Sequence, residues 1–166
     1  GNNAGWTINT AAPRTLYWVG GTGNWEDEAH WSTTSGGAGG NCIPSLADDV
    51  IFDANSFSQS GEVVTINNSP ANCKSMDWTG VSFATEIEAP GTGSIVLYGS
   101  IALSPAVTWN VYTMQFSGGS TGTILTNGVN VQSVVINGSG SWSLADEIFC
   151  LAIGVQEGTL NTNSHD

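Results

Sequence analysis

Three six-residue segments decide the fold: Ser-Ile-Val-Leu-Tyr-Gly at 94–99, Thr-Met-Gln-Phe-Ser-Gly at 113–118 and Ser-Val-Val-Ile-Asn-Gly at 133–138. Each segment ends on glycine and carries large apolar side chains four and two residues before it. Residues two apart lie on the same face of a β-strand, so each segment predicts a short strand with one buried face. Segments that recur at a fixed interval predict a repeat architecture.

The same pattern extends upstream to Ser-Met-Asp-Trp-Thr-Gly at 75–80, and glycine recurs downstream at Gly158, so successive glycines are 19 or 20 residues apart. The last unit departs from the pattern, because Gly154 and Gln156 replace its apolar pair. A unit of this length, divided by turns into two or three short strands, is about one coil of a parallel β-solenoid. The alternative is a β-sandwich, which also has short strands separated by regular turns.

Composition agrees with an all-β protein and excludes two classes of partner. The 166 residues include 22 glycines, 14 acidic residues and only two basic ones, Arg14 and Lys74, for a net charge of −12. Nucleic acids and anionic membrane surfaces need clustered cations, so we expect neither as a partner. No apolar run reaches the roughly 20 residues of a membrane span, so we expect no membrane insertion. Residues 89–145 carry no charged side chain, which suits coils stacked in register.

The first third of the chain has a different character. It is acidic and places three tryptophans, Trp18, Trp25 and Trp31, within sixteen residues. The end of a coil stack exposes apolar side chains that must be covered. We therefore expect three parts, which are listed here in chain order: a tail of a preceding unit with a linker at 1–12, a Trp-rich acidic cap at 13–60, and solenoid coils of about 19–20 residues at 61–166.

Three strings carry a resemblance to a known group of proteins: YWVGGTGNWEDEAHWS at 17–32, NCIPSLADDVIFDANSF at 41–57 and VTINNSPANCKSMDWTG at 64–80. Together they resemble a repeat unit of very large secreted and cell-surface proteins of Bacteroidetes, many of them exported by the type IX system. The resemblance implies a right-handed β-helix in an adhesin-like protein, an extracellular or cell-surface location, and neighbouring repeat units of the same polypeptide as partners. The acidic run at 26–28 departs from that pattern.

Cysteines and acidic residues supply the candidates for a disulfide and a metal site. Cys42 and Cys73 stand in similar settings and could close a loop of about 30 residues as a disulfide, which would stabilise the fold by about 3–4 kcal/mol. The alternative is two buried free thiols. For calcium, the only cofactor that we consider, the candidate oxygen ligands are Asp48, Asp49, Asp53 and Asn55. Acidic side chains beside turns also cap backbone N–H groups, which is the alternative reading.

Function was considered for three classes. Hydrolysis of a polysaccharide needs two facing carboxylates, and nothing in the sequence fixes such a pair among Asp27, Asp48, Asp49 and Asp53, so we expect no enzymatic activity. A carbohydrate-binding module would display Trp18, Trp25 and Trp31 to glycan surfaces, whereas a structural module would bury them. The sequence favours a non-catalytic structural or adhesive β-solenoid module, with the carbohydrate-binding module as the alternative.

Overall fold

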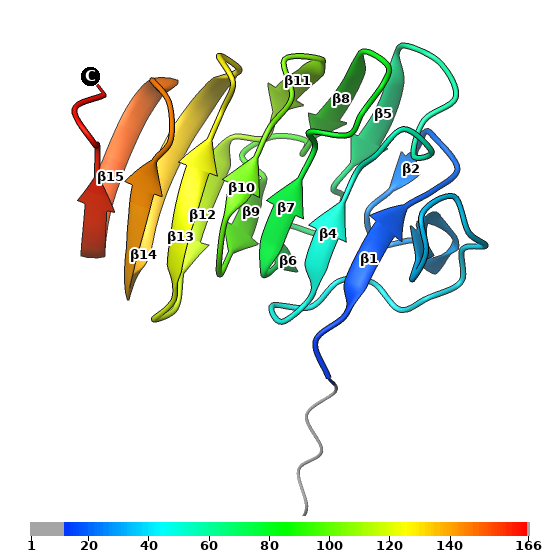
Figure 1. The fold of residues 1–166 in the computed structure, drawn as a ribbon, viewed down its shortest axis with the longest axis horizontal. Coiled ribbons are helices and arrows are strands. Elements are labelled where there is room, and N and C mark those ends of the chain that lie inside the picture. Colours follow the sequence, from blue (N-terminus) through cyan, green and yellow to red (C-terminus); the bar gives the residue numbers. More distant parts are fainter. Residues whose placement is uncertain (1–11, 166) are drawn as a thin grey trace, which may run out of the picture.

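The computed structural model describes residues 12–165, which form a parallel β-solenoid of about five turns (Figure 1). The strands of successive turns pair in parallel, and the single antiparallel pair joins β1 (Thr15–Trp18) to β3 (Trp31–Ser32). In Figure 1 the near strands point upward, the chain crosses to the far side, and successive turns advance to the left, which is a right-handed winding. The β-solenoid prediction is confirmed, and the sandwich alternative is wrong. The expected tail at 1–12 lies almost wholly outside the described residues.

Each turn of the solenoid has up to three sides. The first side consists of β1, β4 (Asp49–Ile51), β7 (Ser75–Asp77), β10 (Ile101–Ala102) and β13 (Thr121–Leu125). The second side consists of β2 (Gly23–Asn24), β5 (Glu62–Thr65), β8 (Thr85–Glu88) and β11 (Val107–Asn110). The third side consists of β6 (Ala71–Cys73), β9 (Ser94–Leu97) and β12 (Thr113–Ser117), and the long strands β14 (Asn130–Leu144) and β15 (Phe149–Asn161) complete the third and first sides.

The core consists of inward side chains stacked in register from one turn to the next. On the first side Val50 pairs with Met76, Met76 with Ile101, and Ile101 with Ile124, and each of these side chains is at most 1% exposed. Neighbouring rungs of a ladder lie about 4.8 Å apart, so each apolar side chain covers the one below it. A single apolar core therefore runs through the described part of the chain.

The turns become shorter along the chain, and this changes the interpretation of the repeat. Partners on the first side follow one another in the order Val50, Met76, Ile101, Ile124 and Leu144, so the turn shortens from 26 residues at the start to 20 at the end. Met76 aligns with Ile101 rather than with Ile95, which lies on the third side. The interval between 75–80 and 94–99 thus joins two sides of the solenoid. The 19–20-residue period describes the later turns alone.

The regular glycines occupy a corner where consecutive backbones approach closely. Gly118 has a φ of +86°, a left-handed conformation that glycine adopts without strain. A Cβ atom added to Gly138 would lie 2.4 Å from the backbone N and O of Gly118, and one added to Gly158 would lie 2.0 Å from the carbonyl oxygen of Gly138. This corner leaves no room for side chains, which explains why glycine recurs in the sequence.

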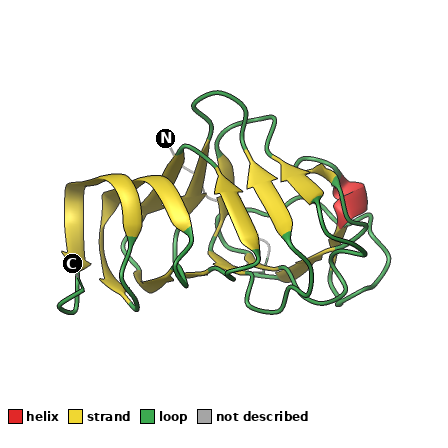
Figure 2. Ribbon diagram, turned by 90° about the horizontal axis from the view of Figure 1, so that it is seen from above, coloured by secondary structure: helices red, strands yellow, loops and turns green. Residues whose placement is uncertain are grey.

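The two ends of the solenoid differ. Figure 2 shows the single 3-10 turn, η1 (Glu28–His30), at one end and β15 at the other. The first turns thus lie beneath the tryptophans, whereas β15 pairs with β14 and with no other strand of the described chain. Within residues 12–165, no helix is both long enough and apolar enough to span a membrane.

The glycine corner can be tested by adding one methyl group. Gly138→Ala forces the Gly118 backbone to move, and we expect the free energy of unfolding to fall by about 1–3 kcal/mol. The matched control is Gly154→Ala on the outermost strand, where an added Cβ meets no atom within 4 Å, so the change should stay within about 0.5 kcal/mol. Urea denaturation of both variants measures the difference, and equal stabilities would contradict the close approach.

Candidate functional site

The three tryptophans proposed as glycan ligands form the core of the N-terminal end. Trp18 and Trp31 are fully buried and Trp25 is 2% exposed. Their rings pack edge to face, with centroids 5.1 Å apart for Trp18 and Trp31 and 4.8 Å apart for Trp25 and Trp31. Edge-to-face contacts of this kind add to the stabilisation that comes from burial.

The polar atoms of this cluster are also used internally. The indole N–H of Trp18 donates to the carbonyl oxygen of Gly21 at 2.7 Å, and that of Trp31 donates to the carbonyl oxygen of Trp25 at 2.8 Å. His30 stacks on Trp18 with 4.6 Å between ring centroids. A sugar ring has no access to these faces, so the prediction that Trp18, Trp25 and Trp31 bind glycans is wrong.

Asp48, the first of the proposed calcium ligands, is held by an internal network. Its side chain is 2% exposed, and its carboxylate accepts hydrogen bonds from the Arg14 guanidinium at 2.7 and 3.1 Å, from the Arg14 amide at 2.9 Å, and from the amide and hydroxyl of Ser45 at 2.8 Å each. Burial by itself raises the pKa of Asp48, but these donors outweigh it and hold the pKa well below its usual range. This carboxylate links β4 to the segment before β1.

The other proposed ligands have partners in different directions. Asp49 accepts from the Lys74 ammonium at 3.3 Å, and Asp53 accepts from the backbone amide of Asn55 at 2.8 Å. The side-chain amide of Asn55 donates to the hydroxyl of Ser35 at 2.9 Å. No group of three or more His, Cys, Asp or Glu side chains within residues 12–165 is arranged to hold a metal ion. The four side chains thus connect and cap the local backbone, and the structure gives the calcium prediction no support.

The Asp48 network makes stability depend on pH. A carboxyl group whose pKa is lower in the folded than in the unfolded state stabilises the fold above the unfolded pKa of about 3.9, and this contribution is lost as the pH falls below that value. We therefore expect Asp48→Asn to reduce the free energy of unfolding by about 1–3 kcal/mol at pH 7, because the Arg14 charge loses its partner. The deficit should shrink towards pH 2. Thermal unfolding from pH 2 to 7 measures it, with the exposed Glu147→Gln as control; a deficit independent of pH would contradict the assignment.

The cysteines proposed as a disulfide are separate thiols. Cys42 is exposed and Cys73 is fully buried in the third side, so the predicted bridge is wrong and only Cys73 fits the buried-thiol alternative. Burial raises the pKa of the Cys73 thiol well above its usual range, and it also raises that of Cys150. Thiolates are the reactive form, so the three cysteines should differ in their reactivity.

Alkylation tests this arrangement. In the native protein, iodoacetamide should modify Cys42 within minutes at pH 8, while Cys73 should react only after unfolding. Mass spectrometry of tryptic or chymotryptic peptides, prepared without reductant, identifies the modified residues. A linked Cys42–Cys73 peptide would overturn the description of both cysteines.

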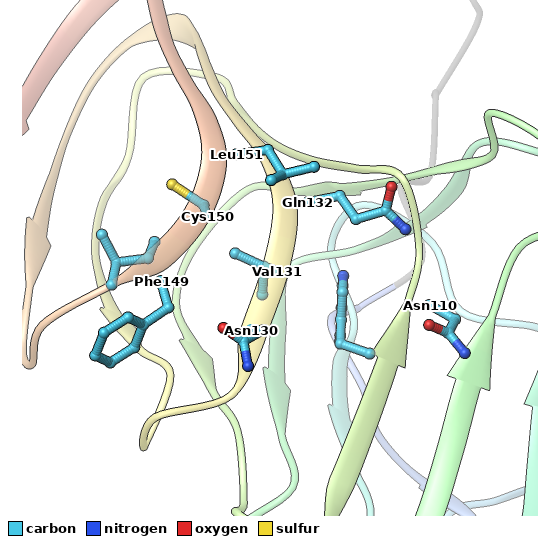
Figure 3. Close-up of a pocket in the computed structure, with 9 residues that line it drawn as sticks. Asn110, Asn130, Val131, Gln132, Phe149, Cys150 and Leu151 are labelled. Atoms are coloured by element: carbon cyan, nitrogen blue, oxygen red, sulfur yellow. The ribbon is translucent and has the colours of Figure 1, made fainter.

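The largest hollow in the described surface lies along the second side, at β11. Among the described strands β11 pairs with β8 alone, and its other edge faces the loop before β14 and the start of β15. A groove of about 540 Å³ runs here, and an adjoining groove of about 370 Å³ shares Trp109, Asn110 and Asn130 with it. We call the two together the β11 groove (Figure 3), and its first part is lined by Trp109, Asn110, Asn130, Val131, Gln132, Ile148, Phe149, Cys150 and Leu151.

Amide and apolar side chains alternate in this groove. Figure 3 shows Asn130 and Gln132 on one strand, with Asn110 on one side of them and Phe149 and Leu151 on the other. Phe149 is 46% exposed and Leu151 is 86% exposed, so both apolar side chains are accessible. Pattern reasoning missed this site, because Asn110 and Asn130 resemble ordinary turn residues. The one sequence signal is the shortening of the repeat just before Asn130.

Comparisons with known proteins add no family to this description. Scans against protein-family models, curated proteins and solved structures found no match. The fold and the geometry of the site are therefore the basis for the functional proposals.

Proposed function

We propose that this chain is a non-catalytic structural module of a large extracellular or cell-surface protein, in which it supports adhesive regions. The observation that carries the proposal is the outermost strand, β15. Its side chains Ile153 and Val155 continue the inward columns of Val134 and Ile136, which are fully buried. Ile153 is nevertheless 44% exposed and Val155 51% exposed, because no rung covers them. An uncovered edge of this kind is a template for further β-pairing.

The aromatic end supports the same proposal. It is closed by Trp18, Trp25 and Trp31, whereas the β15 end offers free backbone groups and apolar side chains. A solenoid with one closed and one open end can be extended in one direction, by β-structure that belongs to the same polypeptide. Continuous parallel ladders couple each turn to the next, which suits a stiff spacer. The acidic residues near the described cap are used in caps and ion pairs, as for Asp48, and this use agrees with a structural role.

The test compares the same substitutions in two contexts. Ile153→Thr with Val155→Thr should change the free energy of unfolding of the isolated chain by no more than about 0.5 kcal/mol per site. In the full polypeptide, where we propose that further β-structure covers β15, the pair should cost about 1–3 kcal/mol per buried hydroxyl. Val134→Thr is the matched buried control and should be costly in both contexts. Equal and small costs in both contexts would refute the stacking role.

The location is tested separately on cells that express the native gene. Protease added to intact cells should remove the module from the cell surface, while a cytoplasmic marker protein stays uncut. Protection of the module until the cells are lysed would contradict an extracellular position without affecting the stacking test.

A further inference from the structure

We propose that the β11 groove binds a neutral oligosaccharide. This site is distinct from the tryptophan cluster. It follows from the shape, the hydrogen-bonding groups and the charge of the second side of the solenoid.

The groove exists because the turns shorten. The turn that leads from Ile101 to Ile124 has 23 residues, and the next one, from Ile124 to Leu144, has 20. The shorter turn has no separate strand on the second side, so β14 begins at Asn130 and pairs with β12 and β13 rather than with β11. The resulting step in the surface is part of the packed backbone, and a site on such rigid elements is pre-organised for a ligand.

Backbone groups of β11 point into this step. The amides of Thr85 and Ala89, on the β8 side, donate to the carbonyl oxygens of Ala106 and Asn110 at 3.0 and 3.2 Å. Successive residues of a strand direct their backbone polar groups to opposite sides, so the N–H and C=O of Trp109 face away from β8 and towards the groove. A sugar hydroxyl both donates and accepts, so it can pair with the donor and the acceptor of one residue.

Side-chain chemistry adds to this preference. The amides of Asn110, Asn130 and Gln132 each carry a donor and an acceptor, and Glu86 on β8 accepts a hydrogen bond from the Asn110 amide and so orients it. Beside them, Phe149 offers an accessible aromatic ring. Polar groups that fix orientation, combined with an aromatic surface, are the usual composition of a small-molecule site.

Charge selects among the glycans. Residues 89–145, which supply most of the groove, carry no charged side chain, and the groove lining contains no cation. Arg14 and Lys74, the two basic residues, are engaged by Asp48 and Asp49 at the first turns. An acidic polysaccharide would find no counter-charge here, so the ligand class is a neutral glycan. The combined length of the two grooves indicates an oligosaccharide, since the first part alone lies in the range of about 300–1,000 Å³ for ligand pockets.

The site is independent of the proposed stacking role. Asn130 pairs with Phe149 in the β14–β15 ladder, and both side chains lie outside the inward columns that a further turn would cover. Failure of glycan binding would therefore leave the stacking proposal intact, and failure of stacking would leave the groove open.

The experiment uses hexasaccharides of glucose (β-1,4 and α-1,4), mannose, xylose and N-acetylglucosamine as neutral probes, with hexagalacturonate as the acidic probe. Isothermal titration should detect a neutral probe at millimolar or lower dissociation constant. For that probe, Leu151→Ala, Phe149→Ala and Asn130→Ala should each weaken binding about fivefold or more. Leu46→Ala is the matched control, because Leu46 is 56% exposed and lies outside the groove. Circular dichroism and urea denaturation confirm that the variants fold.

Amide chemical shifts provide a second measurement. On titration with the bound probe, the side-chain resonances of Asn110, Asn130 and Gln132 and the backbone amide of Trp109 should shift, whereas those of Trp18 and Trp25 should not. The proposal is overturned if no neutral probe binds at 10 mM, if the acidic probe alone binds, or if binding persists unchanged in Phe149→Ala and Leu151→Ala.

Discussion

Stacking in register is the constraint on which the rest of this molecule depends. Every inward side chain lies about 4.8 Å above its counterpart in the previous turn, so a position that is apolar in one turn must be apolar in the next. The first-side column from Val50 through Ile124 shows the result, with no member more than 1% exposed. The same constraint disfavours charge repeated in register, and it accounts for the neutral stretch at 89–145.

Turn length is the variable that this constraint leaves free. A turn can lose residues at its corners or on one side while its remaining strands keep their register. The chain uses this freedom between Ile124 and Leu144, where the second side no longer has a strand of its own. The consequence is local: the ladder on the first and third sides continues, while β11 keeps one free edge. A feature that looks like a defect in the repeat thus produces the main hollow of the described surface.

The two ends solve the problem of uncovered rungs differently. Aromatic side chains close the first turns, and they satisfy their indole N–H groups on nearby carbonyl oxygens, as Trp18 does on Gly21. The buried ion pair of Arg14 with Asp48 fixes the chain that enters this end. At β15 the half-exposed Ile153 and Val155 have no such cover. This asymmetry gives the module a direction, which a spacer built from successive units requires.

The sequence by itself determined the fold class, because strand alternation and regular glycines are local signals that stacking preserves from turn to turn. It also excluded partners that need clustered cations. Tertiary structure alone decided which residues share a rung: Met76 faces Ile101 and not Ile95, since a period measured along the chain cannot say which side of a turn a strand occupies. It also decided exposure. Tryptophan has the same letter in a core as in a binding face, and only the packing around Trp18, Trp25 and Trp31 buries them, whereas the step beside β11 leaves Phe149 accessible.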